Sequence, residues 1–208
     1  MALVRTHPLW RPYELPDDEQ IARARIHPHV PEVVEVAPPD PAWPDWFARV
    51  RDRITTALGP LAVRIEHVGS TSVPNLWAKP VIDVELTVPD STDESAYVPA
   101  LEAAGFELRV REPEWEQHRL FRGHAPESNV HVFSPAAREP QRQRLFRDWL
   151  TTNDDDREAY GNLKRALAQQ EFSDVMHYNN AKASLIYDIY ERIFLTDPTS
   201  AHDPRPRT

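Results

Sequence analysis

Residues 66–86 read EHVGSTSVPNLWAKPVIDVEL, and this stretch predicts the centre of the fold. It contains the end of one alternating, β-rich segment at 61–68 and most of a second at 81–88. A short loop that begins with Gly-Ser joins the two segments. Because alternation with a period of two is typical of half-buried strands, we expect two neighbouring strands with a polar loop between them.

The loop after the first strand combines a glycine with three hydroxyl side chains. Gly69 is followed by Ser70, Thr71 and Ser72. A glycine lets backbone N–H groups approach an anion, and hydroxyls add further donors, so the loop is a candidate phosphate cradle. The simpler alternative is an ordinary turn between two strands.

The second strand carries two carboxylates on one face. Asp83 and Glu85 are two residues apart, so both project to the same side, while the apolar residues of the strand face the core. Adjacent carboxylates repel each other unless a cation lies between them, and such oxygen ligands suit Mg²⁺. The pair is therefore a candidate metal site, and a merely solvated polar face is the alternative.

Outward from these strands, apolar spacing predicts the remaining elements. We expect helices at 17–26, 45–58, 94–104, 138–151, 154–170 and 174–195, and further strands at 106–111, 118–122 and 129–133. This order predicts an α+β fold. The expected units are an N-terminal extension with a short helix (1–31), an α/β core (32–136), a C-terminal helical subdomain (137–195) and a disordered tail (196–208).

The composition of the 208 residues excludes several classes of protein. There is no cysteine, so disulfides, thiolate metal sites and thiol nucleophiles are excluded. A formal net charge of -9 argues against binding of long nucleic acids, which depends on basic residues at phosphates. No apolar run approaches the length of a membrane span, and no signal peptide is apparent, so we expect a cytoplasmic protein without a membrane partner.

The detailed strings resemble a known family. A strand, Gly-Ser, a short loop and a strand with Asp-x-Glu resemble the nucleotidyltransferase fold. EHVGSTSVP followed by AKPVID resembles more specifically the GrpB family, which also occurs fused to dephospho-CoA kinase in some bacteria. Further matching strings are VEVAPPDPAWPDWF, HRLFRG, HVF, FRDWL, YGNLKRAL and YNNAKASLI, so the resemblance covers about residues 32–194. It implies a nucleotidyltransferase-like mixed sheet with flanking helices.

The resemblance also implies roles for the loop and the carboxylates. Gly69 and Ser70 would contact a nucleoside triphosphate, and Asp83 and Glu85 would hold Mg²⁺.

The third carboxylate of nucleotidyltransferases normally lies on a later strand, here NVHVF at 129–133. That strand has Asn129 and His131, where the family usually has His-x-His. His131 is thus a candidate catalytic base and a further candidate metal ligand.

The basic residues are unusual because only three of the 24 are lysines. Lys79, Lys164 and Lys182 all lie in the matching strings, and the last two each follow a tyrosine by four residues, after Tyr160 and Tyr178. Residues at this spacing share one helix face. A tyrosine that stacks on a base and a lysine that pairs with phosphate would suit a nucleotide, with Lys164 the weakest of the three cases. The alternative is that the tyrosines pack in the core and the lysines extend from its edge.

Four further features have both a functional and a structural explanation. Arg119 could clamp a phosphate, or form a surface ion pair with a nearby glutamate. Trp77 could line an acceptor pocket or cover the core. His67 is interpreted as a structural, hydrogen-bonded residue, and the acidic run at 154–156 as a helix start with an aspartate as N-cap.

Three functions remain open. The first is a Mg²⁺-dependent nucleotidyltransferase that uses a nucleoside triphosphate and a small-molecule acceptor. The second is a cyclase, ligase or hydrolase with Mn²⁺ or Zn²⁺ held by His131, Asp83 and Glu85. The third is a non-catalytic module for nucleotide binding or folding assistance. We expect a monomer or a homodimer in each case.

Overall fold

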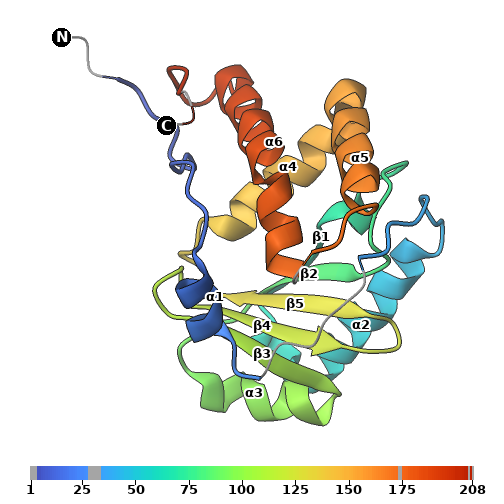
Figure 1. Ribbon diagram of the computed structural model, residues 1–208. Coiled ribbons are helices and arrows are strands. Elements are labelled where there is room, and N and C mark those ends of the chain that lie inside the picture. The colour runs from blue at the N-terminus through green and yellow to red at the C-terminus, as the bar shows by residue number, and fades with distance from the viewer. Residues whose placement is uncertain (1–3, 28–33, 173–174, 206, 208) are drawn as a thin grey trace.

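The computed structural model describes residues 4–27, 34–172, 175–205 and 207 (Figure 1). Five strands form one mixed sheet in the order β1-β2-β5-β4-β3. They are β1 (Arg64–Val68), β2 (Ile82–Thr87), β3 (Phe106–Glu112), β4 (His118–Gly123) and β5 (Ser128–Phe133). All neighbouring pairs are antiparallel except β2 and β5, which are parallel and form the centre of the sheet. The predicted α+β class is confirmed.

Two helices cover one face of the sheet. They are α2 (Trp43–Leu58) and α3 (Glu94–Ala103). The apolar residues of the central strands pack against them, including the fully buried Val84 and Val130. Burial of apolar surface is the main stabilising term of such a layer. The helix α2 ends at Leu58, and the C-cap Gly59, with a φ of 53°, donates its N–H to the Thr55 carbonyl.

Three helices lie on the opposite face (Figure 1). They are α4 (Glu139–Thr152), α5 (Asp154–Leu167) and α6 (Val175–Thr196), which share a second apolar cluster with the loop after β1. The helix α5 begins as expected within an acidic run, although its N-cap is Asn153, whose side chain accepts from the Asp156 N–H at 3.0 Å. These helices therefore form a layer over the polar face of β2.

The two ends of the described chain lie together on α6. The short helix α1 (Asp18–Ala24) precedes a bridge from Arg25 to the edge strand β3. Further toward the N-terminus, Arg5 pairs with Asp203, and the Asp203 N–H donates to the Arg5 carbonyl at 3.1 Å. The prediction of a disordered tail is wrong for residues 197–205, because hydrogen bonds tie them to the N-terminal segment and to α6.

None of the helices in the described part of the chain combines the length and apolar composition that a membrane span requires.

Candidate functional site

Asp83 lies at the centre of the polar face, directly beside the loop after β1. A Cβ atom on Gly69 would lie 2.3 Å from the Asp83 Oδ2 atom, and the φ of Gly69 is 68°. Only glycine avoids both the clash and the strain. Asn129 on the neighbouring strand donates from Nδ2 to Asp83 Oδ1 at 2.9 Å. The loop backbone and a half-buried carboxylate are thus in direct contact.

The Asp83 carboxyl remains ionised in spite of its burial. Burial alone would raise its pKa, but His131, the Asn129 amide and Lys182 together lower it below the ordinary value. Asp83 therefore supplies a negative charge beside the Asn129 amide and the amine of Lys182.

The hydroxyls of the loop are mostly used inside the protein. Thr71 Oγ1 donates to the Val81 carbonyl at 3.1 Å and lies 3.0 Å from His67 Nε2. Ser72 Oγ donates to the Gly69 carbonyl at 2.6 Å. The His67 ring stacks on Phe47, and burial lowers its pKa to about 4. These contacts hold the loop in shape and agree with a structural role for His67.

Glu85 does not share an open site with Asp83. Its side chain is fully buried, Oε1 accepts from Thr87 Oγ1 at 2.9 Å, and Oε2 forms an ion pair with Arg144 of α4. A guanidinium of the protein itself thus balances the charge of Glu85. Within the described residues, no three His, Asp or Glu side chains form a group that could hold a metal ion. The expected Mg²⁺ pair, and the set of His131, Asp83 and Glu85 for Mn²⁺ or Zn²⁺, do not fit this arrangement.

All three lysines of the chain lie within electrostatic reach of this site. Lys164 on α5 and Lys182 on α6 interact with each other and with Asp83, and Lys79, just before β2, interacts with Lys182. Lys164 is buried, and its Nζ lies 4.5 Å from the ring centroid of Tyr160 with no hydrogen-bond partner among the described residues. Burial, followed by the charge of Lys182, lowers its pKa to about 6.

The second lysine has a similar but less extreme environment. Lys182 Nζ lies 4.1 Å from the ring centroid of Tyr178, which is buried. Burial lowers the pKa of Lys182 to about 8, although Asp83 acts in the opposite direction. Tyr160 packs with Val73 and Leu76, so one tyrosine reaches the loop after β1. The pairs of tyrosine and lysine expected from their spacing thus both lie at the site.

His131 lies on β5 beside Asp83, and its Nε2 is 3.8 Å from Asp83 Oδ1. Its other nitrogen, Nδ1, is 3.1 Å from Nε2 of His118 on β4. Sequence reasoning missed His118, which occurs in the string HRLFRG. Alternation along the strand was the only sequence signal for His118. Because His118 precedes Arg119 by one position, the two side chains project to opposite faces of the sheet.

Arg119 is not part of this site. It lies on the face of β4 that packs on α3, where its Nε donates to Glu94 Oε1 at 2.6 Å. The expectation that Arg119 clamps a phosphate at the cleft is therefore wrong, because alternation places it with the core residue Phe121. Trp77 is half-buried, with the Arg165 guanidinium 4.9 Å from its ring.

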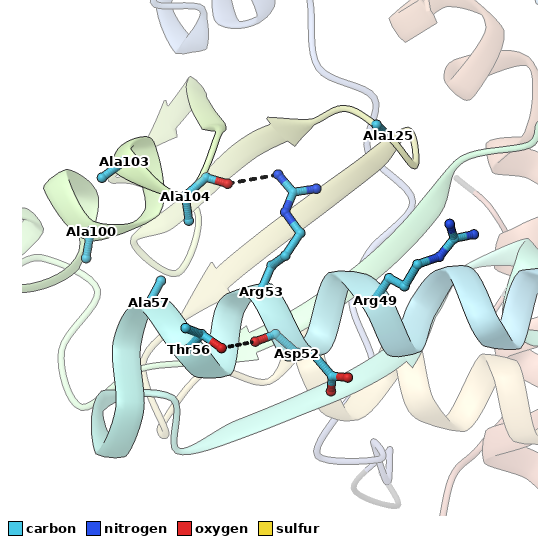
Figure 2. A pocket seen from close by; sticks show the side chains of 9 residues that line it. All are labelled: Arg49, Asp52, Arg53, Thr56, Ala57, Ala100, Ala103, Ala104 and Ala125. Carbon is cyan, nitrogen blue, oxygen red and sulfur yellow. Dashed lines mark hydrogen bonds between the residues drawn. The ribbon is translucent and has the colours of Figure 1, made fainter.

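A separate hollow of about 770 Å³ lies between α2 and α3. Figure 2 shows its small alanine side chains and Arg53, whose Nη2 donates to the Ala104 carbonyl at 2.9 Å. Arg53 Nη1 also donates to the His124 carbonyl at 3.0 Å, so this guanidinium is used inside the protein. The hollow is on the α2 and α3 side, away from Asp83, and offers no comparable chemistry.

Comparison with known proteins identifies relatives of the whole core. A family profile described as "GrpB protein" matches residues 33–192. A UPF0157 protein from Halalkalibacterium halodurans is 51% identical over 153 residues, which cover 74% of this chain and 78% of the relative. A dephospho-CoA kinase from Mycolicibacterium paratuberculosis is 31% identical over 199 residues, and the match covers 83% of this chain but only 47% of the kinase.

A solved structure, that of the GrpB protein from Enterococcus faecalis, has the same fold with a TM-score of 0.65 and 28% identity. The match covers 76% of this chain and 96% of that structure. The predicted resemblance is thereby confirmed, and the chain belongs to the GrpB family.

Proposed function

We propose that this protein binds a nucleoside triphosphate between the sheet and helices α5 and α6, and transfers its nucleotidyl group to a small acceptor. The single observation that carries the proposal is Lys164, whose buried Nζ has no hydrogen-bond partner among the described residues. Buried polar groups are almost always hydrogen-bonded, and a buried amine without a partner is costly. A bound phosphate would supply the missing acceptors and would favour the charged amine.

The neighbouring groups suit the same ligand. Lys182 and Lys79 add positive charge. We propose that backbone N–H groups at Gly69 and Ser70 also approach the phosphates, as the resemblance implies. Tyr178 is buried, so it does not stack on a base; it holds the Lys182 Nζ 4.1 Å from the centroid of its ring. Three lysines in a chain that otherwise uses arginine are thus explained by one anionic ligand.

The transfer step requires a base for the acceptor hydroxyl. In the proposed reaction the acceptor oxygen attacks the α-phosphorus, the bond to the pyrophosphate oxygen breaks, and the hydroxyl proton moves to His131 Nε2. The lysines stabilise the charge that develops on the phosphate oxygens. Asp83 lies 3.8 Å from the same nitrogen and would stabilise the imidazolium that forms.

We propose a Mg²⁺ site with one protein carboxylate in place of the expected pair. Because Arg144 pairs with Glu85, Asp83 is the one carboxylate of the expected pair that is open to a ligand. Magnesium is commonly held by one carboxylate together with substrate phosphates and water. We propose that any ion arrives with the nucleotide, and no step of the proposed reaction depends on it.

Relatives named dephospho-CoA kinase support the proposal that this chain binds a ligand with phosphate groups. This chain spans about half the length of those relatives, 47% in each case, so a segment like it occurs in one chain with a phosphoryl-transfer enzyme.

Titration calorimetry with ATP, CTP, GTP and UTP, with and without Mg²⁺, tests the proposal. We expect at least one nucleotide to bind, and Lys164→Met and Lys182→Met to lose most of the affinity. Arg51→Met is the matched control, because Arg51 is 47% exposed on α2, on the other side of the sheet. Failure of all four nucleotides to bind the folded wild type would refute the proposal. Binding of a nucleotide that releases no pyrophosphate in the presence of any acceptor offered would refute the transfer step.

A further inference from the structure

A continuous row of four polar side chains crosses the sheet. Glu112 on β3 lies opposite His118 on β4, and the row continues through His131 on β5 to Asp83 on β2. His118 Nδ1 is 2.7 Å from Glu112 Oε2, and His118 Nε2 is 3.1 Å from His131 Nδ1. The gap from His131 Nε2 to Asp83 Oδ1 is 3.8 Å, which is too long for a hydrogen bond. Two imidazoles thus lie between two carboxylates.

The surroundings of His118 favour its neutral form, and its two polar neighbours determine which nitrogen holds the proton. The ring is buried against Phe133 and Trp115, and burial lowers its pKa to about 4. A neutral imidazole has one N–H and one lone pair, and an ionised carboxylate can only accept. The short contact with Glu112 therefore requires the proton on His118 Nδ1, which leaves the lone pair on Nε2.

The same reasoning extends to the second ring. His118 Nε2 is an acceptor, so His131 Nδ1 must donate to it across the 3.1 Å contact. A neutral His131 then has its lone pair on Nε2. The reverse arrangement would put a lone pair of His118 against the Glu112 carboxylate at 2.7 Å. The row thus has room for one more proton, and the vacant position is His131 Nε2, beside Asp83.

We propose that Glu112 and His118 are positioning residues that keep the proton of His131 on Nδ1, so that Nε2 is free to accept a proton from the substrate. This inference rests on the proposed function for its catalytic meaning, but the arrangement of protons can be measured without it. In the transfer reaction the acceptor O–H bond breaks, its oxygen bonds to phosphorus, and its proton joins Nε2. The imidazolium then has an acceptor on each side, His118 on one and Asp83 on the other.

Long-range ¹H–¹⁵N NMR of the imidazole rings tests the proton positions directly, since protonated and unprotonated ring nitrogens have different ¹⁵N shifts. At a pH at which both rings are neutral, we expect wild-type His131 to show a protonated Nδ1 and an unprotonated Nε2. His118→Phe removes the acceptor with a ring that suits the apolar surroundings, and we expect the His131 proton to move to Nε2, toward Asp83. Glu112→Lys, which offers only donors, should shift His131 in the same direction.

Glu112→Gln is the conservative control, because its amide oxygen still accepts from His118 and should retain the wild-type arrangement. A wild-type His131 with its proton on Nε2 would overturn the proposal, and so would an unchanged His131 in His118→Phe. Where turnover is measurable, His118→Phe should lower kcat by about tenfold to a hundredfold and leave KM for the nucleotide unchanged. An equal loss in kcat for Glu112→Gln would refute positioning, whereas the expected NMR result without any turnover would refute only the proposed function.

Discussion

Replacement of Lys164 by methionine should stabilise the protein and remove most of the proposed affinity for nucleotide. Lys164 is 2% exposed, and its Nζ has no hydrogen-bond partner among the described residues. Methionine is unbranched and of similar length, so it fills the same space without a charge to desolvate. We therefore expect Lys164→Met to unfold at a higher urea concentration than the wild type in the absence of nucleotide.

The size of the gain follows from proton linkage. The pKa of Lys164 is about 6 in the folded protein, against an ordinary value of 10.5. Between these two values the unfolded chain binds a proton that the folded chain does not, so unfolding is favoured. At about 1.4 kcal/mol for each pH unit below 10.5, the penalty at pH 7 is about 5 kcal/mol. It is largest below pH 6 and disappears above pH 10.5.

Urea denaturation of both proteins, followed by circular dichroism across this pH range, measures the effect. The free energy of unfolding should differ most at low pH, and the difference should shrink as the pH rises. Lys182→Met is the graded comparison, since Lys182 has a pKa of about 8 and should give a smaller gain. A Lys164→Met variant no more stable than the wild type at pH 7, or a gain that does not change with pH, would refute the reasoning.

Three further predictions concern single contacts. Gly69→Ala should lose about 1–3 kcal/mol more than Gly59→Ala in denaturation, because both have a positive φ but only a Cβ at 69 meets a carboxylate, at 2.3 Å. Arg144→Met leaves the fully buried Glu85 unpaired and should lower the free energy of unfolding by about 3–5 kcal/mol. Addition of Glu85→Gln should recover most of this loss, and a double variant that recovers nothing would contradict the ion pair. Because the pKa of His118 is lowered to about 4, stability should fall as the pH drops from 6.5 toward 4, and His118→Phe should show a weaker dependence in thermal melts.

Local patterns were sufficient for most of the secondary structure. The expected helix at 45–58 is α2 and the expected strand at 81–88 is β2, each within two residues at its ends. Alternation also put Asp83 and Glu85 correctly on one face of β2. These features depend on spacing within one element, which the sequence displays directly.

The parts that were wrong depend on contacts between distant elements. Nothing near Glu85 in the sequence indicates that Arg144, 59 positions later, lies over it. The order of the strands, which brings His118 beside His131, likewise cannot be obtained from periodicity. Arg119 is different, because its alternation with Phe121 already indicated the core face, and the functional interpretation took precedence over that signal.

The parallel pairing of β2 with β5 divides the sheet into two parts that are each continuous in sequence. One part is the β1–β2 hairpin, residues 64–87, and the other is the β3–β4–β5 meander, residues 106–133. Asp83 comes from the first part and His131 from the second, so the candidate site exists only where the two parts join. Closure of a long loop is slower than formation of a hairpin. During refolding, the proposed binding of nucleotide should therefore return only after the strands of each part have formed. Recovery of binding would then measure the last stage of folding.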